Sequence, residues 1–232
     1  MKFKSSKNTA ILIFANSSKE ELRQKPFAKN PILFEAMTEQ TLLEVQKTGI
    51  PYYHCTEIEQ KGATFGERFV NAIESIYELG FENIITVGND CPQLKATHLN
   101  KAYQHLQLGQ TILGPSRDGG FYLMGLHHSN FDRDLFIRLP WQRLGLFNSI
   151  TTVFNTLSNG LYLLPVHQDI DSLLDVKKVL AFSKDLSKNL IKILQELLAD
   201  NKKTQISRSL LISHLFFSHY HNKGSPMIFN FL

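Results

Sequence analysis

The sequence has few cysteines and no apolar stretch of the roughly 18 residues that a membrane helix needs. The two cysteines, Cys55 and Cys91, make no disulfide framework and fit a reducing cytoplasm. The basic-then-apolar start, MKFKSSKNTAILIFA, imitates a signal peptide. Its apolar core AILIFA is too short and lacks a small-residue cleavage site, so we interpret it as a first strand. A cytoplasmic protein without a membrane span is expected.

Several catalytic motifs are also missing. No Walker P-loop, GxGxxG or GxSxG occurs, which argues against those NTPases, dinucleotide enzymes and hydrolases. The 9 histidines show no HExxH or other metal-binding spacing, and neither cysteine has a catalytic histidine partner visible in the sequence.

The composition is that of a globular protein. Hydrophobic residues make up 43% and charged residues 20% of the 232 positions, enough for one sizeable core. The net charge of +4 comes from 25 basic and 21 acidic residues, and the basic ones are scattered. A nucleic-acid groove would need a denser basic patch with interleaved aromatics. A small anionic substrate needs only a few of these cations.

Hydrophobic patterning predicts alternating strands and helices. Short apolar runs predict strands, and apolar positions at helical spacing predict helices between them. The expected strands are 9–15, 51–55, 83–88, 111–114, 121–125 and 161–166, with helices over 34–47 and 64–79. This order predicts an α/β protein with a mostly parallel sheet covered on both faces, placed in a domain over residues 1–185.

The character of the chain changes after residue 185. Apolar residues at helical spacing run from Leu186 to Leu198, and the polar segment ADNKKT is expected to be a turn before a second apolar segment, SLLISHLFF. Residues 186–232 are therefore predicted as a helical appendage. It would pack on the sheet domain or on a second subunit, which would make a homodimer.

Three acidic segments follow predicted strands, where ligands of open parallel sheets bind. Asp90 in VGNDCPQL could hold a divalent cation or could close a turn. In GPSRDGGFYLMG, the paired Gly119 and Gly120 would let backbone approach a ligand and Arg117 could reach an anion, although Asp-Gly also favours a plain β-hairpin.

The third acidic segment is DIDSLLD, residues 169–175. Asp169 and Asp171 alternate, so in an extended segment both side chains would lie on one face and could share a cation. The alternative makes Asp171 the N-cap of a helix, with Asp175 in its first turns. A site of Asp90, Asp169 and Asp171 would offer oxygen ligands, which favour Mg²⁺ or Mn²⁺ over Zn²⁺.

Taken together, VGNDCPQL, GPSRDGGFYLMGL and LPVHQDIDSLLD resemble, in order and spacing, an uncharacterised bacterial family of GT-A-fold proteins. Its members are glycosyltransferase-like or nucleotide-diphospho-sugar-transferase-like. GATFGERF (62–69) is similar to the glycine-rich segment of that family. The resemblance covers roughly residues 9–182 and implies a GT-A-like three-layer fold that binds a nucleotide or sugar nucleotide and an unknown small-molecule acceptor.

The resemblance also implies roles for individual residues. It implies that Asp90, Asp169 and Asp171 hold the metal, and that Asp118 and Arg117 act at the reacting centre. Gly62, Gly66 and Arg68 of the glycine-rich segment would line the nucleotide side, and Gly119 and Gly120 of the glycine turn would position the acceptor. Lys19, Arg23 and Lys25 in the first loop could add positive charge for the nucleotide phosphates.

Two departures from the family pattern separate the functional hypotheses. The phosphate loop P-x-x-G-x-x-K-T-R-L is replaced by FANSSKEELRQKPFAKN, in which Lys19, Arg23 and Lys25 could substitute as cations, and Asn89 replaces the usual serine. The first hypothesis is a metal-dependent glycosyltransferase or nucleotidyltransferase. The second is a GT-A-like binding module that has lost catalysis, and fold analogy alone does not decide between them.

Overall fold

The computed structural model describes residues 7–157, 160–182, 184 and 186–218, and the side chains of positions 8–203 within these ranges. The chain divides into two compact units, Met1–Leu194 and Gln195–Leu232. Within the described residues, no helix combines the length and apolarity required to span a bilayer.

A six-stranded mixed sheet organises the first unit, in the order β2-β1-β3-β5-β4-β6. All neighbouring strands are parallel except that β5 runs antiparallel to both β3 and β4. The strands are β1 (Lys7–Phe14), β2 (Tyr52–Cys55), β3 (Phe81–Val87), β4 (Thr111–Pro115), β5 (Phe121–His127) and β6 (Leu161–Leu163). The mostly parallel sheet predicted from the sequence is confirmed.

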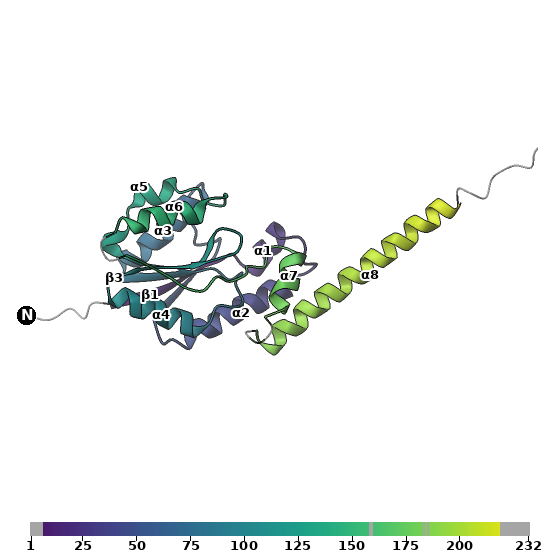
Figure 1. Cartoon of the computed structure of the whole chain (residues 1–232), viewed down its shortest axis with the longest axis horizontal. Coiled ribbons are helices and arrows are strands. Elements are labelled where there is room, and N and C mark those ends of the chain that lie inside the picture. The colour runs from purple at the N-terminus through teal and green to yellow at the C-terminus, as the bar shows by residue number, and fades with distance from the viewer. Residues whose placement is uncertain (1–6, 158–159, 183, 185, 219–232) are drawn as a thin grey trace, which may run out of the picture. The chain divides into compact units, whose positions relative to one another are not determined.

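Helices cover both faces of this sheet (Figure 1). The helices of the first unit are α1 (Ser18–Gln24), α2 (Ile32–Gln46), α3 (Phe65–Glu78), α4 (Ala96–Gln107), α5 (Arg133–Arg138), α6 (Leu146–Asn155) and α7 (Leu173–Leu180), with a 3₁₀ turn η1 (His128–Asn130). One buried cluster joins the sheet to α3, α5 and α6, and the other joins it to α2 and α4. The result is a three-layer α/β sandwich, as expected.

The central strands are buried on both sides because their residues alternate between the two clusters. Leu12 and Ile84 face the cluster that contains α3, whereas Ile11 and Ile85 face the cluster that contains α4. Near-continuous apolar runs are typical of strands covered on both faces. This rigid sheet fixes the positions at which its strand-end loops emerge.

The hairpin between β4 and β5 depends on a close approach at Gly114. A Cβ atom there would lie 2.5 Å from the Tyr122 ring, too close for any other residue. The Tyr122 hydroxyl donates a hydrogen bond to the Pro165 carbonyl at 3.0 Å. These contacts hold the hairpin turn against the segment that follows β6.

The C-terminal prediction is corrected in one respect. The helix α8 runs without interruption from Lys188 to Ser218, so the turn predicted at ADNKKT (199–204) is wrong. Alanine and lysine favour helix, and no glycine or proline interrupts 186–218. The tail HNKGSPMIFNFL lies outside the described residues. The domain boundary at 185 and the packing of the appendage stay predictions.

Candidate functional site

A cavity of about 550 Å³ opens at the carboxyl ends of the parallel strands. Its walls come from the segments after β1 and β3, the β4–β5 turn, the segment after β6, the start of α3, and residues 141–146. Pockets of this size ordinarily hold small ligands, and strand carboxyl ends are where α/β sheets bind them. We call its acidic lining, which comprises Glu21, Asp90, Asp118, Asp169 and Asp171, the acidic floor, and aromatic rings line the cavity as well.

Main-chain contacts bring the predicted acidic segments together. The Ile170 N–H donates to the Asp90 carbonyl at 2.9 Å, which places Asp169 and Asp171 beside the end of β3. The buried Asn89 side chain donates to Thr38 Oγ1 at 2.8 Å and ties the same turn to α2. Asp90, Asp169 and Asp171 all line the cavity.

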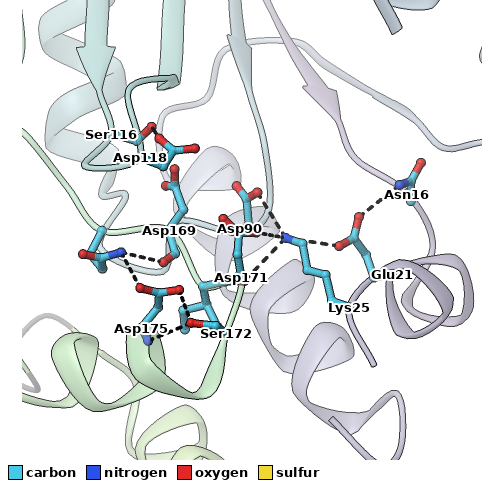
Figure 2. A network of polar contacts seen from close by, with 12 residues as sticks. Asn16, Glu21, Lys25, Asp90, Ser116, Asp118, Asp169, Asp171, Ser172 and Asp175 are labelled. Atoms are coloured by element: carbon cyan, nitrogen blue, oxygen red, sulfur yellow. Dashed lines mark hydrogen bonds and ion pairs between the residues drawn. The ribbon is translucent and has the colours of Figure 1, made fainter. Parts of the chain in front are cut away.

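The first acidic group, which we call the lysine-centred cluster, surrounds the ammonium group of Lys25 (Figure 2). Lys25 Nζ lies 2.7 Å from Asp171 Oδ1, 3.4 Å from Asp90 Oδ2 and 3.4 Å from Glu21 Oε2. The Lys25 side chain is only 17% exposed. Burial alone would lower its pKa, but the surrounding carboxylates, Asp90 first, raise it above the ordinary value.

Burial is also the main influence on Glu21 in this cluster. It raises the pKa of Glu21, with the Asp90 charge adding to the shift and Lys25 opposing it. Glu21 accepts a further hydrogen bond from Asn16 Nδ2 at 3.1 Å. In the lysine-centred cluster, Lys25 therefore provides a positive charge beside all three carboxyl groups.

The second acidic group, which we call the Asp169 pair, consists of Asp118 and Asp169. Asp118 accepts hydrogen bonds from the Ser116 hydroxyl and, at 2.9 Å, from the Gly120 N–H. Asp169 is 7% exposed, and among the described residues its Oδ1 has no hydrogen-bond partner. In Figure 2 the Asp118 and Asp169 side chains point toward each other.

The environment of Asp169 disfavours its charged form. Burial, followed by the charges of Asp90 and Asp118, raises the pKa of Asp169 well above its ordinary value. Among the described residues, no ion pair to Lys, Arg or His offsets either carboxylate of the Asp169 pair. A buried carboxyl group with an unsatisfied oxygen beside two other acids is neutralised either by a proton or by an added cation.

The donors present suit a hard divalent cation. Carboxylate oxygens are the ligands that Mg²⁺ and Mn²⁺ prefer, and the unsatisfied Oδ1 of Asp169 is such a donor. Across the described part of the chain, no three His, Cys, Asp or Glu side chains are arranged to hold a metal ion. The carboxylate oxygens therefore suit Mg²⁺ or Mn²⁺, but the carboxylates would have to move closer together to bind the ion.

The β4–β5 turn is both hairpin and cavity wall. Asp118, Gly119 and Gly120 line the cavity, and Gly119 adopts a left-handed φ of 93° that a side chain would strain. Arg117 is exposed and does not line the cavity. Its predicted role at the reacting centre loses support from this placement.

The predicted N-cap of the helix after β6 is wrong by one residue. Ser172, not Asp171, caps α7: its side chain accepts from the Asp175 N–H. The Ser172 hydroxyl in turn donates to Asp175 Oδ2 at 2.6 Å. Asp171 is therefore left available to pair with Lys25.

The glycine-rich segment GATFGERF contributes mainly through packing. It starts α3 with a capping box in which Thr64 and Glu67 satisfy each other's backbone N–H groups. A Cβ at Gly66 would lie 2.6 Å from Trp141 Cδ1, so this glycine makes room for the indole ring. Neither Gly66 nor Gly62 lines the cavity, whereas Arg68 does.

The loop after β1 offers no phosphate cradle. The N–H of Ser17, which caps α1, donates to Glu57 Oε2 at 2.6 Å, and the Ser17 hydroxyl donates to Glu57 Oε1 at 2.5 Å. A carboxylate of the protein thus occupies the place where an anion would meet the loop. Of the three cations predicted to substitute there, Lys25 lines the cavity, while Lys19 is exposed and Arg23 pairs with Glu20.

Sequence reasoning missed Glu21 and Trp141 as cavity residues. The half-buried Trp141 ring packs against the hydrophobic core and also lines the cavity, together with Phe14, Phe65 and Phe121. Glu21 sits in a short helix with no strong apolar pattern. Its five-residue spacing from Asn16 carries no motif that would have identified it.

A bacterial family model, described as "Uncharacterized protein conserved in bacteria (DUF2064)", matches residues 20–143. The chain belongs to this family. No curated protein matches the chain.

Solved structures support the fold assignment. A candidate nucleotide-diphospho-sugar transferase from Desulfovibrio desulfuricans G20 is similar with a TM-score of 0.73 and 20% identity, over 83% of this chain and 97% of that one. That likeness shows the shared fold.

More distant structures include two with bound ligands. Rv0371c of Mycobacterium tuberculosis H37Rv in complex with manganese has a TM-score of 0.43 and 11% identity, covering 74% of this chain and 97% of that one. CMP:2-keto-3-deoxy-manno-octonic acid synthetase complexed with CTP has a TM-score of 0.42 and 12% identity, covering 76% and 98%.

Proposed function

We propose that this protein is a metal-dependent transferase that binds a nucleotide-activated donor in the cavity. The observation that carries the proposal is the buried Asp169 carboxyl group, whose Oδ1 is unsatisfied and which lies beside Asp90 and Asp118. An isolated acid of this kind costs stability, so its presence in a ligand-sized cavity points to function.

The proposed ligands of the cation are Asp90, Asp118 and Asp169. This choice revises the sequence prediction, because Asp171 is held more closely by Lys25 Nζ than Asp90 is, at 2.7 Å against 3.4 Å, and is the more exposed of the two. Mg²⁺ or Mn²⁺ bound there would neutralise the charge of the donor's diphosphate. Binding would draw the three carboxylates together from their present spacing.

Protein side chains would supply the remaining interactions. Lys25 fixes Asp90 and Asp171 and adds positive charge at the same end of the cavity. In the transfer, an acceptor oxygen forms the new bond as the bond to the leaving diphosphate or pyrophosphate breaks, and the leaving group keeps the electron pair. The proton of the acceptor hydroxyl would pass to solvent, while Asp118, which Ser116 and Gly120 orient, would remain a ligand of the cation.

One observation favours a second candidate, a GT-A-like binding module without catalysis. Glu57 closes the loop after β1, at the position where a phosphate would otherwise meet backbone N–H groups. A module of this kind would bind a nucleotide compound without turning it over. Glycosyl and nucleotidyl transfer stay alternatives within the first candidate.

The test is a thermal-shift panel of nucleoside diphosphates, triphosphates and sugar nucleotides, with and without Mn²⁺. We expect a Mn²⁺-dependent rise in melting temperature with one base, lost in Asp90→Ala and Asp169→Asn. The matched control is Asp134→Asn, an exposed aspartate outside the cavity, which should respond as the wild type does.

The outcomes separate the candidates. Binding followed by product release, monitored by phosphate or pyrophosphate formation with candidate acceptors, supports the transferase. Binding without turnover of any compound supports the module. The absence of any nucleotide response under all metal conditions would contradict both.

A further inference from the structure

Four aromatic rings line the cavity besides the acidic residues. We call Phe14, Phe65, Phe121 and Trp141 the aromatic wall. The Trp141 ring centroid lies 5.5 Å from that of Phe65 and 6.0 Å from that of Phe121, and the Phe14 and Phe65 centroids are 5.7 Å apart. All four rings are half-buried and line the cavity, so they offer it apolar surface.

The aromatic wall is held rigidly. Trp141 Nε1 donates to the Phe136 carbonyl at 2.7 Å, and the absence of a side chain at Gly66 lets the indole pack on α3. The next residue, Gln142, has a φ of 57° and is the sole non-glycine residue with positive φ in the described part of the chain. Such backbone strain is tolerated where the surrounding structure imposes it, often at ligand sites.

Two guanidinium groups accompany the aromatic wall. Arg68 and Arg143 both line the cavity, and neither forms an ion pair with a carboxylate among the described residues. Arg23 and Arg133, by contrast, are paired with Glu20 and Glu74. Arg68 is oriented by its Nε, which donates to Gln60 Oε1 at 3.2 Å. Its Nη groups retain donors for an anion.

We infer that the aromatic wall binds a small apolar compound with one anionic group, the acceptor side of the proposed transfer. Its apolar part would pack on Trp141 and Phe65, and its phosphate or carboxylate would meet Arg68 and Arg143. Of the four rings only Trp141 carries a hydrogen-bond donor, and its N–H is already bonded to the Phe136 carbonyl, so the wall itself offers a ligand apolar contacts. That the bound compound is the acceptor of the transfer rests on the proposed function. That such a compound binds at the aromatic wall does not.

The chain carries its own reporter for this site, because Trp141 is its one tryptophan. Phenyl phosphate and geranyl phosphate would be titrated separately while tryptophan emission is followed, without metal or nucleotide. These two probes separate an aromatic from an isoprenoid ligand. Glucose 1-phosphate, benzyl alcohol and inorganic phosphate test a polar ring, a neutral ring and a bare anion.

We expect a saturable emission change with at least one apolar phosphate, at a Kd about tenfold or more below that of glucose 1-phosphate and of inorganic phosphate. The variant Arg68→Gln/Arg143→Gln should weaken this binding about tenfold or more, because it removes charge-assisted hydrogen bonds. Arg138→Gln, an exposed arginine outside the cavity, is the matched control and should bind like the wild type.

Two results would overturn the inference: glucose 1-phosphate binding as tightly as both apolar phosphates, or the double arginine variant binding them unchanged. Repeating the titration in Asp169→Asn separates this inference from the proposed function. A retained tryptophan response, with nucleotide binding lost, leaves the aromatic site standing independently of the acidic floor.

Discussion

The two acidic groups on the cavity floor share Asp90 as a neighbour but differ in what compensates them. In the lysine-centred cluster, Lys25 contacts Glu21, Asp90 and Asp171. In the Asp169 pair, the more deeply buried carboxyl group has an unsatisfied oxygen and a raised pKa. On our proposal, folding needs the first group complete, whereas a cation completes the second group.

The largest expected effect comes from breaking the lysine-centred cluster. Lys25→Met should lower the free energy of unfolding by about 3 kcal/mol, because it leaves the buried Glu21 and the half-buried Asp90 without their cation. Urea unfolding measures this loss. Lys178→Met is the matched control, since its pair with Asp175 is half exposed, and it should cost below about 1 kcal/mol. Equal costs for the two variants would contradict the comparison.

Asp169→Asn should act in the opposite direction on stability. Without metal, the amide should raise the free energy of unfolding by about 1 to 2 kcal/mol, because it removes a group that the folded state can keep only by binding a proton or by burying a charge. The same variant should weaken Mn²⁺-dependent nucleotide binding about a hundredfold, or about 2.7 kcal/mol. Urea unfolding and calorimetric titration check the two effects. A destabilised variant with unchanged binding would make Asp169 a structural residue.

The free energy of unfolding should also depend on pH, because two buried acids have raised pKa values in the folded state. Glu21 and Asp169 have ordinary pKa values of 4.5 and 3.8, both raised in the folded state. Above those ordinary values the folded state keeps protons that the unfolded chain has released, so both groups lower stability as pH rises toward the raised pKa values.

The measurement for that prediction is urea unfolding across a pH series with Glu21→Gln/Asp169→Asn. The unfolding free energy of the double variant, relative to the wild type, should increase with pH above about 4. Asp134→Asn serves as the control and should track the wild type. A relative stability that falls with pH would mean that both acids are stabilised in their charged form.

The smallest effect is expected at Asp171. Its side chain is 47% exposed, so its ion pair with Lys25 is screened by solvent. Asp171→Asn should cost below about 1 kcal/mol in urea unfolding and should keep the Mn²⁺-dependent nucleotide response. Loss of that response would restore Asp171 to the metal ligands that the sequence suggested.

Much of the fold was predictable because the strands are short apolar runs that end in turn residues. The apolar run ending at Val87 and the turn residues after it identify both β3 and the position of Asp90. The glycine pair of the β4–β5 turn predicts a hairpin, and Asp118 lines the cavity as part of it. A turn was predicted at ADNKKT, where the structure has helix α8. The prediction failed because polar residues are as common on the exposed face of a helix as in a turn.

The residues of the site were less predictable, because they depend on which side chains far apart in the sequence meet in the folded structure. Nothing in the spacing of Lys25 and Asp90 shows that their side chains meet, since 65 positions separate them along the chain. Asp169 and Asp171 alternate as expected, yet one is buried and the other pairs with Lys25. Trp141 can line the cavity because Gly66 has no side chain that would collide with the indole ring.

The most direct test of the central claim is Mn²⁺ binding measured by electron paramagnetic resonance of the free ion. Wild type, Asp169→Asn and Asp171→Asn would be compared in the presence of the nucleotide that gives the largest thermal shift. We predict that the wild type and Asp171→Asn bind one Mn²⁺ per chain and that Asp169→Asn does not. Binding to Asp169→Asn with wild-type affinity would contradict the account.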